Sequence, residues 1–243
     1  MTIKPYLAMT AWEFQKADPL PQSVAWMACH FSAYGTGLTN IPYTLPEESI
    51  LILNDRIPMH GHNPDKIAAQ LAKISECLRC SGVLLDFQRP EIPEMHEFIN
   101  KILEALSCPA AVSDVYAADH SCAVFLPPCP LNRPLKAHLE NWQGREIWLE
   151  LSSEQTILTL TESGMRSESE GNTAPTEKGF KDDGLHCHYQ IKMHESSAEF
   201  ILWRDIADTA SLLRESAEYG VARAIGFYQQ FPTEHWVNPE KIE

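Results

Sequence analysis

The sequence predicts an α/β protein built as a (β/α)8 barrel. Eight apolar runs of strand length recur along the chain, and segments with helical periodicity separate several of them. A chain of 243 residues also suits one such barrel, which takes roughly 250 residues. The alternative is an open doubly wound sheet, but no glycine-rich phosphate loop follows the first predicted strand.

The predicted barrel strands are short apolar runs that end in polar or turn-forming residues. They cover residues 6–14, 24–31, 49–54, 81–90, 110–116, 122–126, 199–204 and 222–228. A further run at 147–151 is strand-like and receives no place in the predicted barrel.

Two predicted helices flank the fourth strand, at residues 65–80 and 94–106. The first follows the cap-type residue Asn63 and a proline, and its apolar residues recur at spacings of four, three and four. A third helix is predicted from its cap at Asp208 through residue 218, with Gly220 as its stop signal.

Residues 152–198 predict a β-hairpin inserted before the seventh barrel strand. Its two strands are expected at 156–161 and 186–193. Between them, residues 163–184 are dense in Ser, Glu, Gly, Lys and Asp, which predicts a mobile acidic loop. The whole chain, residues 1–243, is predicted to form a single barrel domain that carries this insertion.

The charge and the apolar pattern exclude several classes of partner. A formal net charge of −14 predicts no nucleic-acid footprint and disfavours anionic membrane surfaces. No run approaches the ~18 apolar residues of a membrane span, and the N-terminus does not read as a signal peptide. Seven scattered cysteines predict reduced thiols and a cytoplasmic location. The oligomeric state is left open.

The fourth predicted strand ends in the most informative polar residues of the chain. The stretch Ser-Gly-Val-Leu-Leu-Asp-Phe-Gln-Arg-Pro covers residues 81–90. Alternation places Leu84, Asp86 and Gln88 on one side of the strand, pointing into the opening at the carboxyl ends of the strands, here called the barrel mouth. This pattern predicts a ligand-binding floor. The plainer alternative is a buried Asp–Arg or Asp–amide pair that fills the barrel.

With the strands placed, the chain resembles the family-18 glycoside hydrolases, the chitinase and spore-peptidoglycan hydrolase group. That family carries Asp-Gly-x-Asp-x-Asp-x-Glu on its fourth strand, and residues 81–88 follow the motif in spacing. Residues 200–205 and 220–228 resemble the family's seventh strand and last strand. The resemblance covers most of the chain as a pattern, and it implies a TIM barrel with a sugar-binding mouth.

The motif is only half kept, and the departures concern its chemistry. By resemblance Asp86 matches the aspartate that holds the substrate's acetamido group, and Gln88 stands where the family has its acid glutamate. An amide cannot act as a general acid near pH 7. Ser81 and Leu84 replace two other aspartates of the motif, and Phe227 or Tyr228 stands in place of a tryptophan.

Other acidic, amide and aromatic residues end the predicted strands and are expected to ring the same mouth. Aromatic side chains there could stack on a sugar ring, although each alone is more often packing. The expected ligand-binding residues are Trp12, Glu13, Asn54, Asp55, Arg89, Asp114, Tyr116, Trp203, Asp205 and Tyr228.

Two pairs of histidines invite a metal site, but neither predicts one. His60 and His62 lie in the loop after the third strand and are more often caps of the next helix. His186 and His188 share one strand face, and a solvated hairpin is the expected setting. The sequence therefore predicts no metal and no cofactor.

The function predicted from the sequence is a family-18-like barrel that binds a saccharide or sugar-like ligand with little or no hydrolysis. Whether the protein is an enzyme stays open. One alternative is an active hydrolase whose acid comes from another strand, with Glu13, Asp114 and Asp205 as candidates. A second alternative is a non-enzymatic interaction scaffold that uses the inserted hairpin and its acidic loop.

Overall fold

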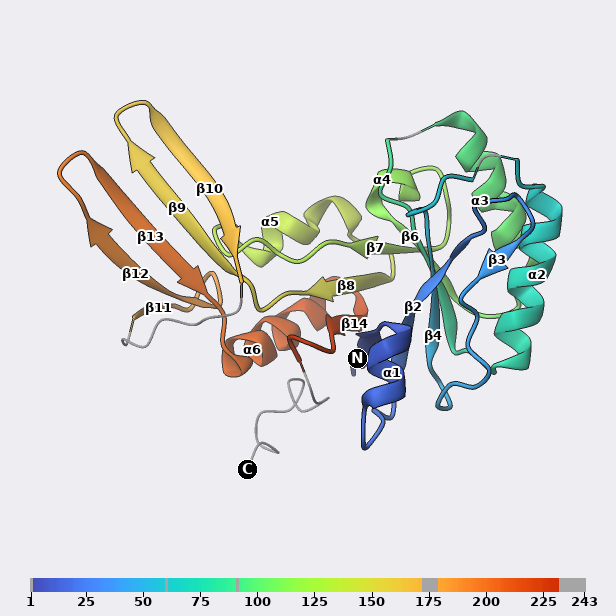
Figure 1. Ribbon diagram of the computed structural model, residues 1–243. Coiled ribbons are helices and arrows are strands. Elements are labelled where there is room, and N and C mark those ends of the chain that lie inside the picture. Colours follow the sequence, from blue (N-terminus) through green and yellow to red (C-terminus); the bar gives the residue numbers. More distant parts are fainter. Residues whose placement is uncertain (1, 60, 91, 172–178, 232–243) are drawn as a thin grey trace.

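A computed structural model describes residues 2–59, 61–90, 92–171 and 179–231 of the chain (Figure 1). Within these residues eight parallel strands form a closed barrel, in the order β1-β14-β8-β7-β6-β5-β4-β2, with β1 also pairing with β2. The barrel strands are β1 (Lys4–Met9), β2 (Val24–Phe31), β4 (Ile50–Asn54), β5 (Gly82–Asp86), β6 (Ala110–Ser113), β7 (Ala123–Leu126), β8 (Ile147–Leu151) and β14 (Val221–Phe227). The predicted (β/α)8 class is confirmed.

Helices connect many of these strands, and the longest two lie where the sequence predicts them. The α-helices are α1 (Ala11–Lys16), α2 (Pro64–Cys77), α3 (Pro93–Ala105), α4 (Asp114–Ala117), α5 (Leu135–Leu139) and α6 (Ile206–Ser216), with 3-10 turns η1 (Glu140–Trp142) and η2 (Ala217–Tyr219). The Asn63 side chain caps α2 by accepting a hydrogen bond from the Lys66 backbone N–H. None of the described helices is long and apolar enough to cross a membrane.

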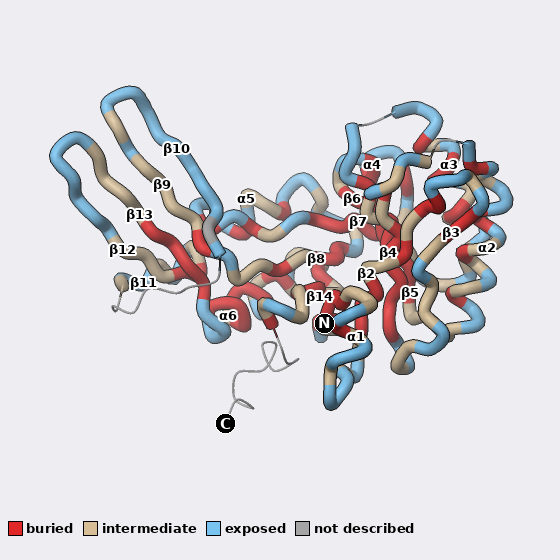
Figure 2. Tube along the Cα trace, viewed as in Figure 1, coloured by how far each residue is buried: buried red, intermediate tan, exposed pale blue. Residues whose placement is uncertain are grey.

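A second, antiparallel sheet is inserted between β8 and β14. Figure 1 shows it projecting away from the barrel, and Figure 2 shows that the strands are exposed at their tips. Its order is β10-β9-β13-β12-β11. The strands are β9 (Gln155–Thr161), β10 (Gly164–Glu170), β11 (Phe180–Asp182), β12 (Cys187–Met193) and β13 (Ser197–Trp203). The remaining strand, β3 (Leu38–Thr39), pairs antiparallel with β2.

The structure corrects the assignment of residues 199–204 to the seventh barrel strand. Most of this segment belongs to β13, which pairs with β9 and β12 in the inserted sheet. The seventh strand of the barrel is β8, between β7 and β14. An apolar run of strand length predicts a strand, but it does not specify which sheet the strand joins, and this ambiguity caused the error.

The inserted sheet is also larger than the predicted hairpin. The segments at 156–161 and 186–193 do not pair with each other, because β13 lies between β9 and β12. The expected loop at 163–184 contains the strands β10 and β11. Residues 172–178 of that loop lie outside the described part of the chain.

Packed side chains fill the barrel interior between its amino end and the mouth. Leu84, Trp148 and Ile225 point inward and are buried among the residues of the barrel interior. The Arg223 guanidinium lies 4.2 Å from the centroid of the Trp148 ring and donates a hydrogen bond of 3.0 Å to the Ser81 carbonyl. Side chains alternate along a strand, so Asp86 and Glu150, two positions beyond Leu84 and Trp148, also point inward. They lie nearer the carboxyl end of the barrel.

Asp208 is not the cap of α6 that the sequence predicts. Asp205 holds that position, and its side chain accepts a hydrogen bond of 2.7 Å from the Asp208 backbone N–H. Asp208 is the third residue of the helix and closes a capping box by accepting from the Asp205 backbone N–H. The predicted stop is confirmed, since Gly220 follows η2 with a φ of 92°.

Candidate functional site

A cavity of about 360 Å³ opens at the barrel mouth. Its walls are largely apolar, and its polar side chains come from the carboxyl ends of β4, β5 and β8 and the turns that follow. That composition is typical of a small-molecule site. The lining residues are Ala8, Met27, Ile52, Asn54, Asp55, Arg56, Leu84, Asp86, Gln88, Phe125, Glu150, Ile225 and Phe227.

Asp86 ends β5 in this cavity, and its only described side-chain partner is an amide. The Gln88 Nε2 group donates a hydrogen bond to Asp86 Oδ1. Burial raises the pKa of Asp86, the hydrogen bond from Gln88 opposes the rise, and the nearby charge of Asp55 adds to it. Within the described residues Asp86 forms no ion pair with Arg56 or Arg89, and no hydrogen bond engages its second oxygen.

Asp55 also lines the cavity, but its carboxylate organises the turn after β5. Asp55 Oδ1 accepts from the Gln88 backbone N–H at 3.2 Å, and Oδ2 accepts from the Arg89 backbone N–H at 3.0 Å. The Arg89 guanidinium donates to the carbonyls of Asp55 and Arg56 and is not part of the lining. Asp55 therefore fixes the backbone that presents Gln88 to the mouth.

Asn54 lies in the lining with most of its amide already engaged. Its Nδ2 donates to the carbonyls of Met27 and Cys29, each at 3.1 Å, and its Oδ1 accepts from the Arg56 backbone N–H. These hydrogen bonds hold the end of β4 against β2.

The ring of Phe227, at the end of β14, forms part of the apolar wall of the same cavity.

Glu150 is the acid that sequence reasoning missed. It points inward from β8 and is half-buried in the cavity lining, and no hydrogen bond or ion pair within the described chain engages its carboxyl. Burial raises the pKa of Glu150 to about 7, with contributions from the charges of Asp86 and Glu154. The sequence signal was the alternation of Trp148 and Glu150, which is informative only once residues 147–151 are placed in the barrel.

The candidate acids named from the sequence do not reach this cavity. Glu13 is buried in α1, where its side chain accepts from the Thr10 backbone N–H and hydroxyl in a capping box. Asp114 begins α4 and accepts from the Val115 backbone N–H. Neither residue lines the cavity, and neither does Asp205, the cap of α6.

The aromatic residues that were expected to surround the mouth also lie elsewhere. Trp12 is 68% exposed on α1, and Tyr116 is 1% exposed, with its hydroxyl donating to the Pro90 carbonyl at 3.1 Å. Tyr228 packs against a core cluster outside the lining. Trp203 lies in the inserted sheet and stacks on His188 with ring centroids 5.6 Å apart.

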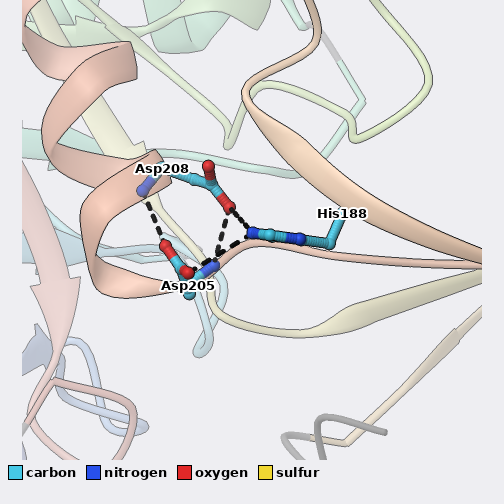
Figure 3. Close-up of side chains that lie close together, drawn as sticks. All are labelled: His188, Asp205 and Asp208. Atoms are coloured by element: carbon cyan, nitrogen blue, oxygen red, sulfur yellow. Dashed lines mark hydrogen bonds and ion pairs between the residues drawn. The ribbon is translucent and has the colours of Figure 1, made fainter. Parts of the chain in front are cut away.

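The inserted sheet meets α6 at a cluster of titratable side chains. Figure 3 shows His188 pointing at Asp205 and Asp208; its Nε2 lies 3.4 Å and 3.2 Å from their Oδ2 atoms. These residues offer three ligand atoms within 4.8 Å of one another, a spacing that a metal ion could use. The Lys181 ammonium lies 3.5 Å from Asp208 Oδ1. Together with the contacts of His188, this ion pair forms a network that joins the inserted sheet to α6.

The other histidines singled out from the sequence have structural contacts. His186 is buried, and its Nε2 lies 2.7 Å from Glu215 Oε2, so the expected solvated setting is wrong for this residue. His62 is buried with its Nε2 at 2.9 Å from the Ser32 carbonyl. His60 lies outside the described residues.

Comparisons with known proteins relate the chain to others through structure. No family model and no curated protein sequence matches it. A chitinase from Chromobacterium violaceum shares the fold with a TM-score of 0.62, 11% identity and 97% of each chain covered. The spore cortex-lytic enzyme SleL of Bacillus megaterium gives a TM-score of 0.60 at 11% identity, over 98% of this chain and 73% of SleL.

A plant chitinase mutant from Cycas revoluta, solved in complex with (GlcNAc)3, gives a TM-score of 0.59 at 9% identity, over 93% of this chain and 95% of the other. At such low identity the similarity establishes the fold. The structural resemblance to family-18 glycoside hydrolases and to SleL is therefore confirmed at the level of the barrel.

Proposed function

We propose that the barrel mouth binds a saccharide or sugar-like ligand. The observation that carries the proposal is the cavity itself, which combines the Asp86 carboxylate, the Gln88 amide and apolar walls that include Phe227. It lies at the carboxyl ends of the strands, where barrels of this class place their sites. Proteins that share the fold are named as chitinases, and one was solved with (GlcNAc)3.

The proposal includes little or no hydrolysis by a residue at position 88, where the resemblance expects the acid. Gln88 stands at the acid position, and its amide donates a hydrogen bond to Asp86 without a proton to transfer. An active hydrolase would need an acid from another strand, and Glu13, Asp114 and Asp205 all lie outside the cavity lining. The interaction-scaffold alternative stays a prediction.

A cytoplasmic location accompanies the proposal. The seven cysteines are all free of disulfides, which is the expected state of thiols in a reducing compartment.

The test is a binding titration with N-acetylglucosamine oligomers and peptidoglycan fragments, read by calorimetry and by thermal shift. At a ligand concentration of about 100 Kd, binding stabilises the folded state by roughly 2.7 kcal/mol. Asp86→Ala should abolish the shift, whereas Asp114→Ala, outside the cavity, should keep it. A shift that survives Asp86→Ala unchanged, or no shift with any saccharide, would count against the proposal.

A further inference from the structure

Besides Asp55, the barrel mouth is lined by two carboxyl groups and by one cation, the guanidinium of Arg56. Asp86 and Glu150 line the same cavity, and neither forms an ion pair within the described chain. They come from β5 and β8, which β6 and β7 separate in the barrel order. The two side chains therefore approach the cavity from different sides, and a ligand that fills it can contact both.

We propose that Glu150 is the proton donor of this site and acts on the glycosidic oxygen of a saccharide bound against Asp86. The inference rests on the proposed saccharide binding. It assigns the missing acid to a residue on β8, three strands along the sheet from β5, the strand that Gln88 follows.

The local environment suits Glu150 to that role. Its carboxyl has no hydrogen-bond partner among the described residues, so its proton is available to a ligand. Burial and the charge of Asp86 bring its pKa to about 7, which keeps a large protonated fraction at neutral pH. Burial raises the pKa of both carboxyls, but at Asp86 the hydrogen bond from Gln88 opposes the rise, and Glu150 has no such bond. Two neighbouring carboxyls in different environments are the arrangement that acid–base catalysis at a sugar uses.

The other polar side chains near the mouth are less suited to donate a proton. Asp55 accepts two backbone N–H groups, from Gln88 and Arg89, and so acts as a structural acceptor. Gln88 carries no transferable proton. The described lining contains three carboxyl residues, Asp55, Asp86 and Glu150. With Asp86 assigned to ligand binding and Asp55 to the turn, Glu150 is left as the proton donor.

The step balances with water as the only co-reactant. Glu150 transfers its proton to the glycosidic oxygen as the bond from that oxygen to the anomeric carbon breaks, and the leaving sugar departs as an alcohol. The Asp86 carboxylate stabilises the positive charge that develops at the anomeric carbon. A water oxygen then bonds to that carbon, and the proton released by the water returns to the Glu150 carboxylate.

The experiment compares wild-type protein with Glu150→Gln and with Glu140→Gln, an exposed glutamate outside the cavity. Each is given N-acetylglucosamine oligomers, which need a protonated leaving group, and a dinitrophenyl glycoside of N-acetylglucosamine, which does not. Glu150→Gln should lower oligomer cleavage about 10²–10⁴-fold, affect the activated glycoside far less and leave oligomer binding intact. Glu140→Gln should match the wild type. The wild-type rate on oligomers should fall as the pH rises through about 7.

Each result decides the inference. Oligomers that bind the wild type but are not cleaved would overturn it and leave the binding proposal standing, whereas absence of both binding and cleavage would overturn both. Cleavage by Glu150→Gln at the wild-type rate, or a wild-type profile flat across pH 7, would also overturn it. If Glu150→Gln does not fold, Glu150→Asp keeps the carboxyl, and its retained but slower cleavage supports the role.

Discussion

At the scale of single residues, three carboxyl groups share one cavity and differ in what surrounds them. Asp55 is held by two backbone N–H groups, Asp86 by one side-chain amide, and Glu150 by no described partner. In the proposed site, these three settings correspond to a structural acceptor, a carboxylate that contacts the ligand and a proton donor. Chemistry at the mouth depends on these environments more than on the number of acids.

The pKa of Glu150 makes the stability of the fold depend on pH. Its pKa is 4.5 in an ordinary setting and about 7 in the folded protein, so the folded state binds more protons between these values. The contribution of Glu150 to the free energy of unfolding is fully present below pH 4.5, and it is lost as the pH rises through about 7. Glu150→Gln should remove that loss. Urea unfolding of both proteins across this range measures it, and parallel pH curves would contradict it.

Gln88→Glu should restore a carboxyl acid where the family-18 resemblance expects one. The new side chain would lie beside Asp86, and two adjacent carboxyls share a proton because both cannot ionise easily. We expect cleavage of N-acetylglucosamine oligomers to rise about 10²-fold, the lower end for a general acid, because Leu84 and Ser81 replace other aspartates of the motif. Gln88→Leu is the control, and equal rates for the two variants would refute the expectation.

The residues at the mouth were predictable where a strand was correctly placed. Asn54, Asp55, Asp86 and Gln88 end two strands whose apolar runs are unambiguous, and all four line the cavity. Glu150 sits on a strand with an equally clear apolar pattern, but the sequence does not say that this strand belongs to the barrel.

At the scale of elements, the amino end of β5 is tightly packed against β8 and β14. A Cβ atom on Gly82 would lie 2.8 Å from the Trp148 ring, 2.7 Å from the Arg223 guanidinium and 3.0 Å from the Pro109 carbonyl oxygen. The Trp148 ring and the Pro109 backbone cannot retreat easily in a packed interior. The small residue at position 82 therefore lets Trp148 and Arg223 close the barrel at this end.

Gly82→Ala should destabilise the fold by about 1–3 kcal/mol through this overpacking. The matched control is Gly171→Ala, since a Cβ there meets nothing within 4 Å. Denaturant unfolding monitored by tryptophan fluorescence compares the two. Equal free energies of unfolding for the two variants would show that the contacts around Gly82 relax without cost.

The placement of β13 shows what sequence patterns leave undetermined at this scale. Its run of apolar residues resembles that of a barrel strand, yet its hydrogen-bond partners are β9 and β12. The pairing of β13 with β9 depends on contacts between segments far apart in the chain, such as Phe200 opposite Leu158. Helix α2 was easier to predict because its cap at Asn63 and its apolar spacing are local.

At the scale of the whole molecule, the net charge shapes which ligands approach the mouth. The formal charge of −14 sets a negative field around the protein, and part of this charge lies in the cavity, where Asp55 and Asp86 are lining residues. Neutral saccharides are indifferent to this field, whereas anionic saccharides are repelled. The protein should therefore discriminate by ligand charge before any contact is made.

Affinity for an anionic oligosaccharide should be lower than for its neutral counterpart at low salt, and the gap should narrow as salt is added. The Debye length falls from about 30 Å at about 0.01 M to about 3 Å at about 1 M, which screens the repulsion. Calorimetric titration at these two ionic strengths tests the effect, with the neutral sugar as the control. Tighter binding of the anionic sugar at low salt would contradict it.

Closure of the barrel joins the first strand to the last, and this has a kinetic consequence. β1 pairs with β14, and Tyr6 contacts Arg223 through a hydrogen bond of 3.3 Å. During synthesis on the ribosome, β1 and β8 must wait with unpaired edges until β14 emerges, whereas the inserted sheet can assemble first from its own consecutive strands. Folding should therefore finish late and slowly, and the half-made barrel is the species most exposed to aggregation.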